Sequence, residues 1–162
     1  MEINIRKDGI LEIENARIIY RNFAGEGSKF NREGDRNFAV IINDEDIKDE
    51  LIENGWNVKI KDPREGYEDE GVFMFLPVKV KFNNRGPAIY VRSGNSIPTR
   101  LNEETVGILD EIDILGVDMD LRPYDWEVNG KEGRTAYLQA MEVTQNIDRF
   151  AARWAEDERL ND

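Results

Sequence analysis

The sequence predicts a mainly β domain with short helices, in which an antiparallel sheet closes or nearly closes into a small barrel with added strands. Two observations predict this class. Short segments rich in β-branched and aromatic residues are separated by turns that contain Gly, Asn or Pro. The few segments with helical spacing do not alternate regularly with these strands. A chain of 162 residues fits one such domain, which we expect at residues 1–150.

Four strands and one helix are expected in the first half of the chain. Asp44 is a natural N-cap for a helix in which Ile47, Leu51 and Ile52 share a face, and Gly55 is placed to end it. The strands are recognised by β-branched residues and by alternation of apolar with polar side chains. They are expected at residues 10–20, 37–42, 56–61 and 72–82, with a Gly-rich loop at 21–35 and an acidic loop at 62–71.

The second half is expected to contain three more strands and a second helix. Asn102 is placed to cap a helix over residues 102–113, whose first turn carries Glu103 and Glu104, where the helix dipole favours acids. Asn129-Gly130 is a strong signal for a hairpin turn. The strands are expected at residues 88–92, 114–128 and 135–144, and a helical pattern follows Asn146.

The position of the second helix favours one kind of barrel. An OB-fold is a five-stranded barrel with a helix between its third and fourth strands, and residues 102–113 precede the last hairpin in a compatible place. Because more than five strands are expected, the prediction is an OB-fold-like antiparallel barrel with added strands. Residues 151–162 are expected to form the end of a C-terminal helix and a short acidic tail.

The chain contains no His and no Cys. Without His it lacks the usual general acid or base near neutral pH, and Ser-His and Cys-His nucleophiles are excluded. Without Cys it has neither disulfides nor thiolate metal ligands. We therefore expect a binding protein rather than an enzyme, with no cofactor and no metal.

The formal net charge of −12 argues at first against nucleic-acid binding, because phosphate contacts need Lys and Arg. Net charge governs solubility and the far field, however, whereas a local patch decides a contact. The positions of the 22 Lys and Arg residues are therefore the informative feature. No stretch has the length and apolarity of a signal peptide or membrane span, so a cytoplasmic protein is expected.

Basic residues are interleaved with aromatic residues in four segments. This pattern suits a single-strand binder, because cations contact phosphates while rings stack on bases. The segments are a Gly-rich loop, a pair of Lys-faced strands that would share an outer face if they are neighbours, strand 88–92, and a hairpin in which Arg122, Tyr124 and Trp126 share a face. In each segment the alternative is structural, with aromatics in the core and lysines protecting a sheet edge. The candidate DNA-binding residues are Arg21, Lys29, Phe30, Arg32, Arg36, Lys59, Lys61, Lys79, Lys81, Tyr90, Arg92, Tyr124, Trp126, Lys131 and Arg134.

Asp118 and Asp120 form a D-x-D pattern on a predicted strand. Alternation places both carboxylates on one face, where they could bind Mg²⁺. Because Val117, Met119 and Leu121 would face the core, a solvated strand face explains the pair without a metal.

Four stretches of the chain carry a recognisable pattern: NFAGEGSKFNREGDRNFAVII, GWNVK, PVKVKF and ILDEIDILGVDMDLRPYDWEVNGKEGRTAYLQAMEVT. In their order and spacing they resemble a family of phage single-stranded DNA-binding proteins with an OB-fold core. The resemblance covers about Arg17 to Val143. It implies a protein that coats and protects single strands without sequence preference in phage replication or recombination, in the host cytoplasm, with replication or recombination proteins or further copies of itself as partners. This chain departs from the family pattern in having only a short, weakly acidic end.

Two other functions remain open at the level of the sequence. The net charge and the acidic loop around residues 65–70 would suit a DNA mimic that inhibits a nucleic-acid-binding enzyme, provided that the surface is acidic throughout. A Mg²⁺-dependent nuclease using Asp118 and Asp120 with Lys131 would need further acids converging on the same point.

Overall fold

In the computed structural model, which describes residues 1–147, ten strands form one sheet, with one α-helix and two short 3₁₀ helices. The mainly β prediction is confirmed. The predicted C-terminal helix and acidic tail lie outside the described residues. The strands are β1 (Glu2–Ile5), β2 (Leu11–Ala16), β3 (Ile18–Asn22), β4 (Arg36–Ile42), β5 (Lys59–Lys61), β6 (Phe73–Val80), β7 (Ala88–Ser93), β8 (Thr99–Leu101), β9 (Ile114–Val128) and β10 (Lys131–Gln145); the helices are α1 (Glu45–Glu53), η1 (Glu68–Glu70) and η2 (Val106–Asp110).

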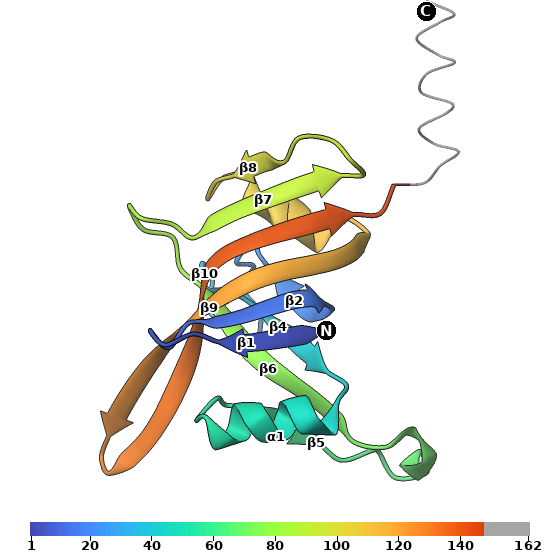
Figure 1. The fold of residues 1–162 in the computed structure, drawn as a ribbon, viewed down its shortest axis with the longest axis vertical. Helices are drawn as coiled ribbons and strands as arrows, with labels where there is room; N and C mark the ends of the chain where they lie inside the picture. The colour runs from blue at the N-terminus through green and yellow to red at the C-terminus, as the bar shows by residue number, and fades with distance from the viewer. Residues whose placement is uncertain (148–162) are drawn as a thin grey trace, which may run out of the picture.

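Two strands that are consecutive in the sequence, β2 and β3, lie near opposite ends of the strand order. The order along the sheet is β1-β2-β9-β10-β6-β4-β3, and Arg17 alone separates β2 from β3 in the sequence. β2 pairs with β9 and β3 pairs with β4, so this one segment of chain serves both ends of the path. The sheet therefore curls around a common core, as in an OB-fold, while β1, β5, β7 and β8 are added strands (Figure 1).

Two pairings in the sheet are parallel rather than antiparallel. β10 pairs in parallel with β6 at Ala136 and Tyr137, and with β7 over Ala140–Gln145. Parallel neighbours need a crossover, and the chain from β6 to β10 provides it by passing through the β9–β10 hairpin. This hairpin extends beyond the body of the sheet (Figure 1).

The core lies inside the curled sheet and is closed at one end by α1 and the residues after it. Leu51 of α1 and Trp56 are buried there beside Phe23, Phe38 and the inward side chains of the strands. Asp44 caps α1 as predicted, since its Oδ1 accepts hydrogen bonds from the Asp46 and Ile47 amides at 2.8 and 3.3 Å. The predicted hairpin is also present, with positive φ at both Asn129 and Gly130.

The second predicted helix is shorter and tighter than the sequence suggested. Asn102 accepts hydrogen bonds from the Glu104 and Thr105 amides, as predicted for a cap, but the only helical turn that follows is the 3₁₀ helix η2. The buried Val106 and Leu109 are three residues apart, which matches three residues per turn.

The strand predicted at residues 56–61 is also only partly correct. Trp56 is buried, but the strand begins at Lys59, and Ile60 is exposed rather than directed inward. Trp56 instead belongs to the turn that follows α1, because its amide donates a hydrogen bond to the Leu51 carbonyl at 2.9 Å. The short strands β1 and β8 were not predicted.

Candidate nucleic-acid interface

The β9–β10 hairpin presents tyrosines and an arginine from two neighbouring strands. Arg122 of β9 lies opposite Tyr137 of β10, and Tyr124 lies opposite Thr135. Because side chains alternate along a strand, these residues share one face of the hairpin. The rings of Tyr124 and Tyr137 meet edge to face with centroids 6.0 Å apart, and the guanidinium carbon of Arg122 lies 5.3 Å from the Tyr137 centroid.

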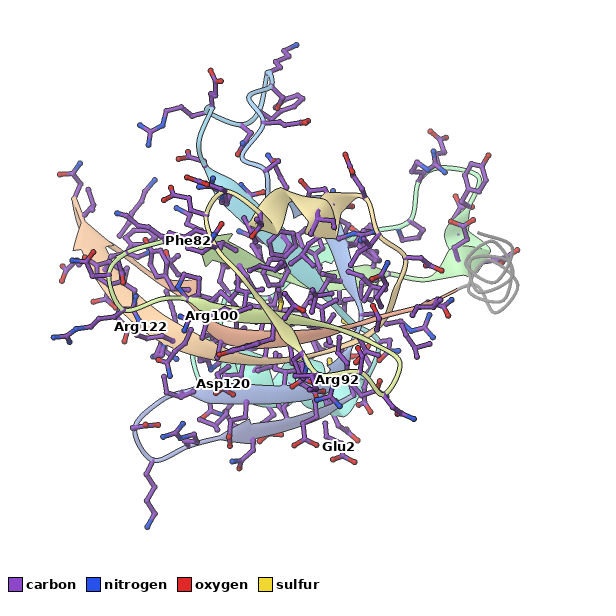
Figure 2. All side chains as sticks on the ribbon, turned by 90° about the horizontal axis from the view of Figure 1, so that it is seen from above. Glu2, Phe82, Arg92, Arg100, Asp120 and Arg122 are labelled. Carbon is purple, nitrogen blue, oxygen red and sulfur yellow. The ribbon has the colours of Figure 1, made fainter. Side chains whose placement is uncertain are left out.

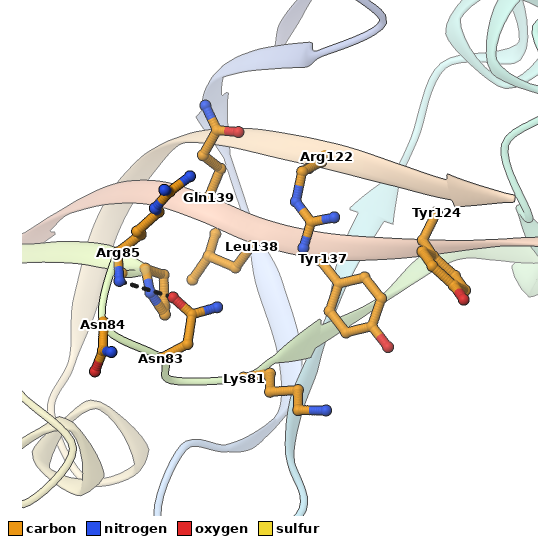
Figure 3. A pocket seen from close by; sticks show the side chains of 11 residues that line it. Lys81, Asn83, Asn84, Arg85, Arg122, Tyr124, Tyr137, Leu138 and Gln139 are labelled. Atoms are coloured by element: carbon orange, nitrogen blue, oxygen red, sulfur yellow. Dashed lines mark hydrogen bonds between the residues drawn. The ribbon is translucent and has the colours of Figure 1, made fainter.

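This face borders a cleft of about 1030 Å³, which we call the main cleft. The turn after β6 supplies its other wall, where Asn83 Oδ1 accepts a hydrogen bond from the Arg85 amide at 2.8 Å. Figure 3 shows the rings of Tyr124 and Tyr137 and the side chain of Lys81 directed toward the same open side. The main cleft is lined by Lys81, Asn83, Asn84, Arg85, Gly86, Pro87, Arg122, Tyr124, Tyr137, Leu138 and Gln139.

The main cleft is basic although the protein is acidic. Its lining contains Lys81, Arg85 and Arg122 and no Asp or Glu. None of the three pairs with a carboxylate from residues 1–147. Three cations without anionic partners, beside two partly exposed aromatic rings, form a surface that favours an anionic ligand with flat groups.

A second hollow of about 480 Å³, the side hollow, continues the main cleft. Lys81 and Tyr137 line both. The side hollow runs over the ends of β4 and β6 to the loop before β4, and it adds Arg32 and Lys79, although Asp35 and Glu103 also line it. We call the two hollows together the groove. It is lined by residues of β4, β6, β9 and β10 and of the loops before β4 and after β6.

The structure brings together five of the residues predicted from the sequence. Lys81 and Tyr124 line the main cleft, and Lys81 also lines the side hollow with Arg32, Arg36 and Lys79. Of these, Arg36 has a structural role: its Nε donates to the Phe23 carbonyl at 2.9 Å and its Nη1 lies 3.4 Å from Glu103.

Arg21 lies apart from the groove and also has a structural role. Its Nη1 donates to the carbonyl oxygens of Leu109 and Ile112, both at 2.8 Å. These hydrogen bonds tie β3 to the segment around η2. Arg21 therefore holds the segment around η2 against β3.

The two pairs of lysines do not form one cluster. Lys59 and Lys61 lie opposite Phe75 and Phe73 at the start of β6, whereas Lys79 lies at its end. Four residues at about 3.3 Å each separate Phe75 from Lys79 by roughly 13 Å. Lys61 Nζ instead lies 5.5 Å from the ring centroids of both Tyr20 and Phe75.

Tyr90 and Arg92 lie on a different, acidic part of the sheet. Arg92 Nη2 forms an ion pair with Glu142 Oε1 at 2.5 Å, and Tyr90 has the guanidinium of Arg100 at 5.9 Å from its ring centroid. The structure does not bring them into the groove.

The outer part of the hairpin carries Trp126, Lys131 and Arg134, which line neither part of the groove. Arg134 forms a two-pronged pair with Asp125, donates to the Asn54 carbonyl at 2.6 Å and lies over Trp56, so it joins the hairpin to α1. Trp126 packs on Gly133 across the hairpin and lines a separate hollow of about 600 Å³. Lys131 is exposed at the hairpin's end.

Lys29 and Phe30 stand at the tip of the loop between β3 and β4. The Phe30 side chain is 93% exposed, and Lys29 Nζ lies 5.8 Å from its ring centroid. Neither residue lines the groove.

Three basic or aromatic residues of the main cleft were missing from the predicted DNA-binding residues. Arg122 and Tyr137 were visible as neighbours of Tyr124 in the strand pattern, and their register across the hairpin was the signal that could have added them. Arg85 lies in a turn, and its approach to the hairpin depends on the parallel pairing of β6 with β10, which no local pattern predicts.

Comparisons with known proteins identify the family to which this chain belongs. A family model described as "Putative phage ssDNA-binding domain" matches residues 2–162. No curated protein sequence matches significantly, and no helix among residues 1–147 is long and apolar enough to cross a membrane.

Solved structures of one phage protein share the fold. The single-stranded DNA-binding protein from bacteriophage Enc34 in complex with ssDNA has a TM-score of 0.56 and 18% identity, covering 91% of this chain and 93% of that chain. The C-terminally truncated form of the same protein gives a TM-score of 0.55 and 18% identity, with coverages of 89% and 90%. The resemblance noted in the sequence is confirmed, and this chain belongs to the phage ssDNA-binding domain family.

Proposed function

We propose that this protein binds single-stranded DNA in the groove without sequence preference, and that it coats and protects single strands during phage DNA replication or recombination. One observation carries the proposal. In a chain of net charge −12, the main cleft gathers three cations and two tyrosines and no carboxylate. Family membership and the fold shared with a phage protein solved with ssDNA support it.

Each group in the groove has a role in this proposal. Lys79, Lys81, Arg85, Arg122 and Arg32 contact phosphates, which are the same for every sequence. Tyr124 and Tyr137 stack on bases, and any base offers a face to a ring. Asn83 and Gln139 also line the main cleft.

A fluorescence titration with labelled oligo(dT) at low and high salt tests the proposal. Because bound cations release counterions from the strand, log K should fall with log[salt] by about 0.7 per phosphate contact. Tight binding at low salt with a slope of several units is expected. Absence of binding at low salt, or affinity indifferent to salt, would refute it.

The two alternative functions find less support in the arrangement of charges. A DNA mimic needs an acidic surface throughout, whereas the main cleft is basic. A carboxylate-metal nuclease needs several acids converging on one point, and no group of three potential metal ligands occurs among residues 1–147. Asp118 is also engaged in the sheet, since its Oδ1 accepts a hydrogen bond from the Asn15 amide at 2.8 Å.

A further inference from the structure

The loop between β3 and β4 forms a rigid finger, residues 25–34, with Phe30 near its tip. Asn31 holds the finger together: its Nδ2 donates to the carbonyl oxygens of Glu26 and Asp35 at 2.9 and 3.0 Å, and its Oδ1 accepts from Asn37 Nδ2 at 2.9 Å. Backbone bonds close the finger at its base and tip, from Gly34 to Gly25 and from Ser28 to Asn31, both at 2.8 Å. A large exposed ring on an ordered support is arranged for contact, because little conformational freedom is lost when it binds.

A shallow hollow of about 250 Å³ lies on the outer face of β7, β9 and β10. Asp120, Ala140 and Ala88 lie side by side across the three strands, and the two alanines leave space above the sheet. Asp118 and Glu142 occupy the next row. Glu12 of β2 lies beside Asp120. The hollow therefore has an apolar floor and carboxylates on the side of β2 and β9, whereas Tyr90 and the Arg92–Glu142 ion pair lie toward β7.

The finger and the hollow are chemically complementary but lie on different sides of the molecule. The finger presents a ring together with the Lys29 ammonium, and the hollow presents alanine methyl groups beside the carboxylates of Asp120 and Glu12. In Figure 2 the loop that carries the finger projects upward in light blue, whereas Asp120 lies toward the opposite side. One copy therefore cannot fill its own hollow, and a contact of this kind joins the head of one copy to the tail of the next.

We propose that the finger of one copy docks into the hollow of a second copy, with Phe30 over Ala88 and Ala140 and Lys29 beside Asp120. Because the two contacting surfaces differ, the interface is heterologous, and a dimer keeps one free finger and one free hollow. Further copies can therefore add head to tail. The contact needs no DNA. Its use, which rests on the proposed function, is to link neighbouring copies along a coated strand and make coating cooperative.

The absence of cysteine in the chain permits a direct test by cross-linking. A first copy carries Ser28→Cys, an exposed finger position that leaves the Phe30 ring in place. It is mixed with a size-tagged copy that carries Ala88→Cys and with a short bis-maleimide, without DNA and then with long oligo(dT). Ile97→Cys, at a side chain 89% exposed outside the finger, is the matched control for Ser28→Cys. Ala140→Cys replaces Ala88→Cys if the latter lowers the melting temperature.

The mixed pair should cross-link about tenfold more than the Ile97→Cys control, as the burial of one ring would give. Equal yields would overturn the proposal, as would preferential linkage of Ser28→Cys to itself. A charge reversal tests the proposed Lys29–Asp120 contact. Lys29→Glu in the copy with the finger cysteine, or Asp120→Lys in the copy with the hollow cysteine, should each reduce the cross-link yield. Mixing the two variants should restore the yield. A combination as weak as either single variant would also overturn the proposal.

DNA-binding measurements on a Phe30→Ala variant distinguish a contact between copies from a contact of the finger with DNA. Phe30→Ala should leave the affinity for an oligonucleotide that holds one copy unchanged, and should reduce cooperativity on long oligo(dT). If Phe30→Ala weakens binding to the short oligonucleotide equally, the finger contacts DNA rather than protein and the docking proposal fails. If the protein binds no oligo(dT), the proposed function fails while the DNA-free cross-link still decides the contact.

Discussion

Tyr124 and Tyr137 contact each other edge to face across the β9–β10 hairpin, with their ring planes at 86°. Neither ring belongs to the buried core, and both line the main cleft, where a ligand can reach them. The pair gives the cleft two ring surfaces at an angle, with Arg122 beside one of them.

Replacing either tyrosine tests stacking directly. Tyr137→Ala should weaken oligo(dT) binding by about 1–3 kcal/mol, because a ring available for base stacking is lost. Tyr137→Phe should retain most of the affinity, since it keeps the ring. Fluorescence anisotropy with labelled oligo(dT) measures both. The stacking role would be contradicted by a Tyr137→Ala variant that folds normally and binds as tightly as the wild type.

Neutralising cations should distinguish the groove from other basic positions. Arg122→Ala and Lys81→Ala should each lower the affinity and reduce the slope of log K against log[salt] by about 0.7, one phosphate contact each. Lys59→Ala, on the separate strand β5, is the matched control and should change neither quantity. A larger loss of affinity for Lys59→Ala than for Lys81→Ala would place the DNA path elsewhere.

The ion pair between Asp125 and Arg134 should make stability depend on pH. The hydrogen bonds from Arg134 hold the pKa of Asp125 below its ordinary value. A carboxyl with a lowered folded-state pKa adds stability above its unfolded pKa, near 4, and loses it as pH falls through the folded-state pKa.

Asp125→Asn should therefore lower the free energy of unfolding at pH 7 by less than about 1 kcal/mol, the range of exposed ion pairs. The difference from the wild type should vanish at acidic pH. Urea unfolding at pH 7 and pH 3 measures it, and a difference that stays constant with pH would show that the charge is not responsible.

Gly133 should not tolerate a side chain, because a Cβ built there collides with the indole of Trp126. Gly133→Ala should displace the indole and destabilise the hairpin by about 1–3 kcal/mol, the range for overpacking. Gly130→Ala, at a position with open space but positive φ, separates collision from backbone strain. Thermal melts and the Trp emission spectrum give the readout, and unchanged emission in Gly133→Ala would rule out displacement of Trp126.

Much of the fold was predictable because its signals are local. The Asp44 cap, the Asn129-Gly130 turn and the alternation of Val117, Met119 and Leu121 toward the core each depend on a few adjacent residues, and the structure confirms all three. The helix at 102–113 was predicted only in part: Asn102 accepts the capping hydrogen bonds, but a 3₁₀ helix follows, in which Val106 and Leu109 are buried.

By itself the sequence determined which side chains exist and how they alternate: a β-rich chain without His or Cys, acidic overall, with basic and aromatic residues gathered in a few segments. Only the tertiary structure decided which of those residues meet. Parallel pairing of β6 with β10 brings Lys79 beside Tyr137, whereas the same fold assigns Arg21, Arg36 and Arg134 to structural contacts. The physical reason is that strand register joins residues distant in the chain, and a cation's role depends on whether carbonyls and carboxylates of the folded protein already bind it.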